Sequence, residues 1–412
     1  MEEKESEIEQ SVMQLEQKID SLATATRFKR KEKAPKSSFG WRWVFPLFIA
    51  AAVAWSAVLI FESGDQLLDS QNGETLDAVT DPTAPGFEAF VEQTWSMAVA
   101  TEDNEGNLVN LVIGTVADRE QGGGSVLIVP PALNLNRDCQ QLPCDLRSVY
   151  SEGGLSALTS ALIDLFGVSF SEEVLLTSSR WSGLISPVTG VEVNLDNALI
   201  EVTDEGTEVT HFPEGEISIT GDEVVKFFSF SGDGNQVDRG KSFWDSWLKE
   251  LGETEDPLEK LPDLGLSIVD FLAVVTSAET GLVTFPIEDV GSSLFPNEEE
   301  LQDLVVDLFP FPIAAIPGER LTVRLINGTG DFTVDSIARK QIVSVGAEII
   351  VVGNNESFDV QESKVIYRDL MVAEEAETFG AQLGLPVEFN ELISPVTEVT
   401  VIIGADFAPA LS

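Results

Sequence analysis

Few residues of this sequence are of the types that usually perform chemistry. There is one histidine, His211, and there are two cysteines, Cys139 and Cys144. A single histidine excludes a histidine-rich metal site and argues against a serine-protease triad. Its Thr-His-Phe-Pro setting is typical of a surface or strand residue. The cysteines enclose a short loop, so we expect a local disulfide, with a metal-binding pair as the alternative.

Acidic residues, glycines and tryptophans supply weaker candidates. Asp118, Asp233 and Asp238 could surround a cation, although such clusters also arise by chance among 70 acidic residues. Gly122-Gly-Gly124 could form an anion-binding nest of backbone amides, or only a flexible hairpin, because no lysine follows it. Three tryptophans are typical either of a core or of a sugar-binding platform: Trp181, Trp244 and Trp247.

The elements that must position these side chains alternate between strands and helices. Within residues 90–312, the expected strands cover 108–114, 125–130 and 188–193, and the expected helices cover 155–166, 221–230 and 239–251. Within residues 318–408, the expected strands cover 321–326, 346–353, 364–367 and 399–403, and the expected helices cover 333–345 and 373–383. This alternation predicts an α/β class with two domains. Residues 63–89, rich in Asp, Gly, Thr and Pro, are interpreted as a linker.

An apolar segment at 41–62 predicts a membrane span. No charged residue lies between Trp43 and Phe61, and at 1.5 Å per residue this stretch reaches about 28 Å, enough to cross a bilayer core. Basic residues cluster before the segment, from Arg27 to Arg42, and are absent just after it. The positive-inside rule therefore places residues 1–40 in the cytoplasm and the bulk of the chain outside it, behind an uncleaved signal anchor in the cell membrane.

The predicted cytoplasmic tail contains a short amphipathic pattern over residues 8–22. Its apolar residues follow an alternating four-three spacing, which is typical of a heptad stripe. Two heptads are too few for an independent coiled coil. Tethering at a membrane favours weak homodimerisation through this stripe, and a solvated amphipathic helix is the alternative.

The charge balance restricts the possible partners. Seventy acidic residues face 24 basic ones, which gives a formal net charge of −46. Such a surface repels polyanions, so we expect no nucleic acid partner and interpret the excess as a salt-adapted surface. The apolar fraction of 43% is that of a globular chain.

Four stretches of the second unit carry a family resemblance: 323–330, 353–358, 365–368 and 401–407. They read Val-Arg-Leu-Ile-Asn-Gly-Thr-Gly, Gly-Asn-Asn-Glu-Ser-Phe, Val-Ile-Tyr-Arg and Val-Ile-Ile-Gly-Ala-Asp-Phe. Together they resemble the LytR C-terminal domain that follows the catalytic domain in actinobacterial LytR-CpsA-Psr proteins. The resemblance covers nearly the whole of residues 318–408.

Three stretches of residues 90–312 resemble the LytR-CpsA-Psr (LCP) catalytic domain: Leu111-Val-Ile-Gly114, Tyr150-Ser-Glu-Gly-Gly154 and Gly190-Val-Glu-Val193. The resemblance implies a single span followed by an α/β/α layered LCP-like domain. It also implies the family's activity, which attaches glycopolymers from a polyprenyl-pyrophosphate carrier to peptidoglycan and uses magnesium. A cell-wall glycan or a lipid-linked precursor is then the implied partner.

The positions that the resemblance assigns to anion binding have mostly lost their charge. Val116 replaces an aspartate, and the remaining family positions fall on Pro131, Ala132, Ser229, Ser231, Gln236, Arg239 and Gly240. Only Arg239 keeps the expected type, while Asp118 and Arg119 lie near the first metal position but out of register. A pyrophosphate needs several guanidinium groups. We therefore predict a non-catalytic binding or scaffolding module of the cell envelope that needs no cofactor.

The alternative is a divergent but active phosphotransferase with a rebuilt magnesium site. In that case we expect one pocket, with Asp118 meeting Arg119, Arg180 and Arg239 at its mouth. A pocket with apolar walls and few basic groups would instead favour the non-catalytic module.

Overall fold

The two longest strands of the chain are apolar enough to form the centre of a sheet. In the computed structural model, which describes residues 79–135, 144–203, 206–230, 236–254, 261–262, 264–265, 267–291 and 293–407, both are buried almost throughout. They are β2 (Trp95–Glu102) and β3 (Leu108–Val116), paired antiparallel with Trp95 opposite Val116 and Glu102 opposite Leu108. Continuous apolar runs of this kind suit a strand covered on both faces.

A five-stranded sheet surrounds this pair in the order β11-β4-β3-β2-β6. The outer strands are β11 (Thr280–Thr284), β4 (Gly124–Ile128) and β6 (Glu172–Leu176). Strand β4 runs antiparallel to β3, while β11 and β6 run parallel to β4 and β2. The end of β3 therefore lies beside the start of β4, whereas the end of β4 lies beside the middle of β3, where Ile128 pairs with Val112.

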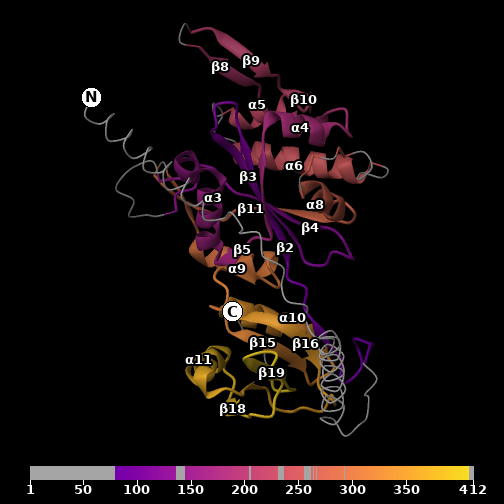
Figure 1. Ribbon diagram of the computed structural model, residues 1–412. Helices are drawn as coiled ribbons and strands as arrows, with labels where there is room; N and C mark the ends of the chain where they lie inside the picture. Colours follow the sequence, from indigo (N-terminus) through magenta and orange to yellow (C-terminus); the bar gives the residue numbers. More distant parts are fainter. Residues whose placement is uncertain are drawn as a thin grey trace, which may run out of the picture. The chain divides into compact units, whose positions relative to one another are not determined.

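Helices cover both faces of this sheet and give three layers, the arrangement that the family resemblance implied (Figure 1). One core joins the sheet to α4 (Ser178–Ile185), α5 (Val224–Ser229), α6 (Gln236–Gly252) and α8 (Ile268–Val275). The other core joins it to α3 (Leu146–Phe166) and α9 (Glu298–Leu308). Side chains alternate between these cores along β2, where Met97 and Val99 face the first and Ala98 and Ala100 face the second.

Helix α3 begins earlier than the apolar spacing at 155–166 predicted. Asp145 caps its N-terminus by accepting from the Ser148 amide at 3.0 Å. Gly154 interrupts the helical backbone at φ +65°, and Gly167 ends the helix in the left-handed conformation. The apolar periodicity is clear only after the break at Gly154, which explains the late predicted start.

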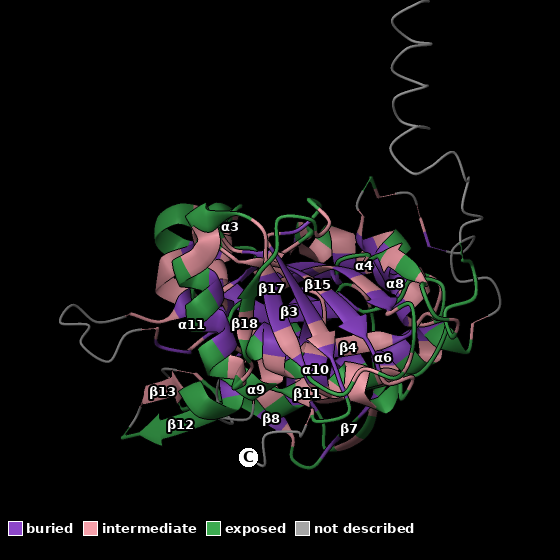
Figure 2. Ribbon diagram, turned by 90° about the horizontal axis from the view of Figure 1, so that it is seen from below, coloured by how far each residue is buried: buried purple, intermediate pink, exposed green. Residues whose placement is uncertain are grey.

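In the part of the chain that the structure describes, four short pairs of strands lie outside the two main sheets: β7 (Val191–Leu195) with β10 (Gly215–Ile219), β8 (Leu199–Val202) with β9 (Glu208–Phe212), β12 (Ile287–Val290) with β13 (Ser293–Pro296), and β5 (Val168–Ser169) with β14 (Ile313–Ala314). The pairs differ in how far their residues are buried. Strand β7 alternates buried and exposed residues, whereas β12 is exposed throughout (Figure 2).

A second sheet of six strands has the order β1-β16-β15-β19-β17-β18. Its strands are β1 (Glu88–Phe90), β16 (Glu348–Asn354), β15 (Thr322–Asn327), β19 (Val399–Ile403), β17 (Lys364–Tyr367) and β18 (Val387–Phe389). Helices α10 (Thr333–Ser344) and α11 (Ala373–Leu383) pack on it, and the 3-10 turn η1 (Leu370–Val372) precedes α11. The predicted α/β class holds for this part as well.

One edge of the second sheet is formed by residues that the sequence assigned to a linker. Glu88 and Ala89, the last residues of the predicted 63–89 linker, lie in β1 and pair with Gly353 and Val352 of β16. We call residues 81–91 the strap. The composition of 63–89 did not reveal this strand, because a three-residue strand carries almost no periodicity.

The predictions for residues 1–78 lie outside the described residues. They comprise the amphipathic stripe at 8–22, the span at 41–62 and most of the linker. Within the described ranges, no helix combines the length and apolar character that crossing a bilayer requires.

Candidate functional site

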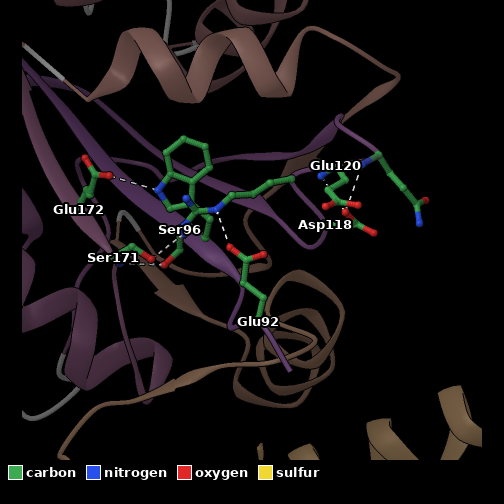
Figure 3. Close-up of polar contacts among 9 residues, drawn as sticks. Glu92, Ser96, Asp118, Glu120, Ser171 and Glu172 are labelled. Atoms are coloured by element: carbon green, nitrogen blue, oxygen red, sulfur yellow. Dashed lines mark hydrogen bonds and ion pairs between the residues drawn. The ribbon is translucent and has the colours of Figure 1, made fainter. Parts of the chain in front are cut away.

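Asp118 and Arg119 lie in the turn that follows β3. The Asp118 carboxylate accepts hydrogen bonds from the backbone amides of Glu120 at 2.8 Å and Gln121 at 3.1 Å (Figure 3). This is the geometry of an aspartate that closes its own turn. Its carboxylate oxygen is therefore engaged with the main chain.

Arg119 is held at the surface by an aromatic ring and an acid. Its guanidinium lies 4.2 Å from the ring centroid of Trp95 and pairs with Glu92 at 3.0 Å (Figure 3). The Trp95 indole in turn donates to Glu172 at 3.2 Å. The cation that the sequence proposed for phosphate binding at this turn is therefore already paired with a carboxylate, which makes the position unfavourable for an anion.

Arg239 lies on α6 and is buried, with 4% of its surface exposed. Its Nε donates to the Phe227 carbonyl at 3.0 Å, and its Nη2 donates to the Phe230 carbonyl. These carbonyls belong to the last turn of α5 and the residue after it, where main-chain acceptors lack helical partners. The guanidinium also packs against the rings of Phe227 and Phe230. Arg239 therefore caps the C-terminal end of α5.

The structure does not bring the predicted site residues together. Gln236, three residues before Arg239, donates to the Val109 carbonyl at the start of β3, whereas Asp118 follows its end. At about 3.3 Å per residue, Val109 and Val116 lie on the order of 20 Å apart along the strand. Asp118 and Arg119 therefore cannot share one site with Arg239.

Arg180, the third arginine expected at a rebuilt transferase site, also has a partner elsewhere. Arg180, on α4, donates to the Leu175 carbonyl of β6. Asp238 lies on α6 with Arg239, far from Asp118, and Asp233 lies outside the described residues. Across the described ranges, no three acidic, histidine or cysteine side chains form a cluster that could hold a metal. The donor set around Asp118 does not fit the magnesium that the family resemblance implies.

A polar network occupies the end of the sheet near Arg239. Asn110 accepts from the Trp244 indole at 3.1 Å, and Gln236 donates to the carbonyls of Val109 and Phe228 at 3.1 and 2.7 Å. Arg147, at the start of α3, donates to the Gln236 side-chain oxygen. We call these side chains, together with Glu102 and Tyr150, the sheet-end network.

Tyr150 and Glu102 complete the sheet-end network. The Tyr150 hydroxyl donates to the Glu102 carboxylate at 2.5 Å. Burial, followed by the hydrogen bond to Glu102 and its negative charge, raises the pKa of the Tyr150 hydroxyl well above its ordinary value. The hydroxyl is thus a hydrogen-bond donor at neutral pH and a poor general base.

Sequence reasoning missed most of the sheet-end network. The sequence offered one signal, because Asn110 interrupts the apolar run Leu108–Gly114. In the structure this side chain is buried, with 4% exposed. A buried polar residue inside such a run needs a partner. The identity of that partner, Trp244, depends on the fold.

The remaining candidates are structural. Trp181, Trp244 and Trp247 are at most 2% exposed, so of the two alternatives they are core residues. Gly122 and Gly123 donate their amides to the carbonyls of Asp118 and Val274, so these amides do not form an anion nest.

The lone histidine and one of the two cysteines have partners of their own. His211 lies in β9 and contacts Glu201 of β8 at 2.6 Å. Cys144 is disulfide-bonded, whereas Cys139, its predicted partner, lies outside the described residues.

Comparison with known families identifies the second sheet and its helices. Residues 320–407 match the family described as LytR cell envelope-related transcriptional attenuator. This part of the chain is a LytR C-terminal domain. The predicted resemblance to a LytR C-terminal domain is thereby confirmed.

Residues in the motifs of the LytR C-terminal domain stabilise turns within that domain. The side-chain oxygen of Asn327 accepts from the amides of Thr329 at 2.8 Å and Gly330 at 3.1 Å, which fixes the turn after β15. A Cβ at Gly328 would lie 2.6 Å from Val360, so only glycine fits. The resemblance therefore rests on residues that shape the backbone.

Solved structures resemble about half of the chain at low similarity. TagV of B. subtilis shares 13% identity with a TM-score of 0.42, covering 52% of this chain and 96% of its own. TagU of B. subtilis shares 14% with a TM-score of 0.35, covering 53% and 96%. The LytR-CPS2A-psr family protein YwtF (TagT) with bound octaprenyl pyrophosphate lipid shares 12% with a TM-score of 0.39, covering 57% and 92%. At these values the likeness carries no functional conclusion. No curated protein matches the chain.

Proposed function

We propose that this protein is a non-catalytic, LCP-like module of the cell envelope that binds or scaffolds during glycopolymer assembly. The LytR C-terminal domain, whose family is described as cell envelope-related, supports the envelope role. We further propose anchoring through the segment 41–62, with the N-terminus cytoplasmic and the bulk extracytoplasmic. A cell-wall glycan or a lipid-linked precursor is the proposed partner, and residues 8–22 supply the proposed weak dimer contact.

The observation that carries the non-catalytic proposal is the role of Arg239. It is the only arginine in register with the family's anion-binding positions, and its donors are directed at the carbonyls of Phe227 and Phe230. Each charged hydrogen bond to a phosphate is worth about 1.5–3 kcal/mol. A site that has lost several of them would not hold a pyrophosphate leaving group.

The alternative, a divergent phosphotransferase, has one observation in its favour. Arg147 and Arg239 both lie near the start of β3, linked through Gln236 and its neighbours. Against it, Arg147 already donates to Gln236, and the expected convergence with Arg119 and Asp118 does not occur. A transferase would therefore have to reorganise the sheet-end network.

A transfer assay tests the proposal. The purified full-length chain is incubated with a polyprenyl-pyrophosphate-linked glycan, peptidoglycan and Mg²⁺, and glycan attached to peptidoglycan is measured. We expect no product above a protein-free control. Binding of octaprenyl pyrophosphate is measured in parallel, with TagT as the positive control. Transfer that is lost in Arg239→Lys, while the variant keeps its melting temperature, would establish the transferase instead.

A further inference from the structure

A small cavity lies between α10 and the strap. Its volume is 340 Å³, at the small end of the range for ligand sites. Pro82 and Phe87 of the strap form one wall, and Phe311 and Phe332 contribute further apolar surface. Asn354 donates to the carbonyls of Pro82 and Ala84 at 2.9 and 2.8 Å, which holds the strap wall in place.

Two opposite charges lie on the same side of α10 at this cavity. Asp335 and Arg339, four residues apart and both lining it, face the same direction on a helix. Such a pair would normally form an ion pair. Among the described residues, however, no ion pair joins the two, and Arg339 donates to the Pro310 carbonyl instead.

The Asp335 carboxylate has an unmet acceptor. Its Oδ1 is buried and has no hydrogen-bond partner within the part of the chain that the structure describes. Burial raises the pKa of this carboxyl, Asn327 opposes the shift through a hydrogen bond, and the charge of Asp331 adds to it. Asp335 also lines the cavity, where an ammonium donor would pair with its carboxylate and offset the cost of burying the charge.

Two contacts orient the Arg339 guanidinium and leave its positive charge in place. Its Nη1 donates to the Pro310 carbonyl at 3.3 Å, and its guanidinium lies 5.8 Å from the centroid of the Phe311 ring. Both contacts orient the planar group without cancelling its charge. A carboxylate is the anion that such a guanidinium binds with two parallel hydrogen bonds.

We propose that this cavity binds a small zwitterion, an α-amino acid with an apolar side chain. The ammonium group binds Asp335, the carboxylate binds Arg339, and the side chain packs against Phe87 and Phe332. The observation behind the assignment is two unpaired opposite charges beside a phenylalanine-lined cavity of amino-acid size. The inference does not rest on the proposed function.

Calorimetric titration of the full-length chain tests the ligand class. The probes are leucine and phenylalanine in both configurations, with L-leucinamide, which lacks the carboxylate, and N-acetyl-L-leucine, which lacks the ammonium. We expect at least one free amino acid to bind, and each derivative of leucine to bind at least tenfold more weakly than leucine, about 1.4 kcal/mol. The proposal fails if no amino acid binds below a Kd of about 1 mM, or if either derivative binds as tightly as leucine.

Matched variants locate the binding. Asp335→Asn and Arg339→Gln should each weaken binding at least tenfold. Glu356→Gln and Lys340→Gln make the same charge changes outside the cavity lining and should have no effect. If a helix variant does not fold, Phe332→Ala, at a ring already 43% exposed, should still weaken binding of phenylalanine. Undiminished binding in the cavity variants would place the ligand elsewhere and overturn the proposal.

Discussion

Arg119 and Arg239 show how burial decides what an arginine does. Arg119 keeps 47% of its side chain exposed and contacts Trp95 and Glu92 at the surface. Arg239 is enclosed, and its donors bind carbonyls in the last turn of α5 and at the residue after it. A charge moved from water into a protein interior must gain such contacts to be tolerated. The arginine that resembles a catalytic residue is therefore a structural one.

Replacing Arg239 by alanine should destabilise the protein by about 2–4 kcal/mol, because buried carbonyls lose their donors. Arg119→Ala removes the same charge from an exposed position and should cost less than about 1 kcal/mol. Urea unfolding followed by tryptophan fluorescence measures both. Equal effects of the two substitutions would contradict the capping role of Arg239.

At the scale of elements, the strap completes the LytR C-terminal domain. Strand β1 covers the edge of β16, which would otherwise expose unpaired amides and carbonyls. Gly353 permits this approach, because a Cβ there would lie 2.4 Å from the Phe87 carbonyl oxygen. The Arg324–Glu88 ion pair adds a side-chain link between the strap and β15.

The substitution Gly353→Ala should displace the strap and cost about 1–3 kcal/mol, as overpacking against backbone usually does. Hydrogen exchange of the amides in residues 88–91 should accelerate. Gly281→Ala is the matched control in a strand, because its Cβ would meet only ordinary contacts at 3.8 Å and beyond. Unchanged exchange in the Gly353 variant would show that the strap does not depend on this glycine.

At the scale of the whole molecule, negative charge dominates. The sequence carries 46 more formal negative than positive charges, so most carboxylates repel one another across the surface. Ion pairs such as Lys364–Glu388, at 2.8 Å, relieve this only locally. The folded state is more compact than the unfolded chain and therefore bears more of the repulsion.

Salt should therefore stabilise the protein. Between about 0.01 M and 1 M monovalent salt the screening length falls from about 30 Å to about 3 Å, and we expect the melting temperature to rise across that range. Differential scanning calorimetry in sodium chloride and in choline chloride measures the effect. Similar increases in both salts indicate screening, whereas a decrease in both would contradict the argument.

Local patterns in the sequence determined the fold class, the nature of the second domain and the buried face of at least one helix. Apolar runs and helical spacing predicted the α/β class, and four short motifs carried the resemblance to a LytR C-terminal domain, because both depend on residues close together in the chain. Burial of Phe243, Trp247 and Leu251 along α6 likewise follows from their spacing of four.

Tertiary structure alone decided which polar groups meet. Asp118 follows β3 and Arg239 lies near its start, so the length of one strand separates two residues that the transferase alternative would bring together. The strap and the Asp335–Arg339 cavity unite segments far apart in sequence. Periodicity specifies which face of an element is buried, but the register and direction of the elements packed against it set the distances between side chains.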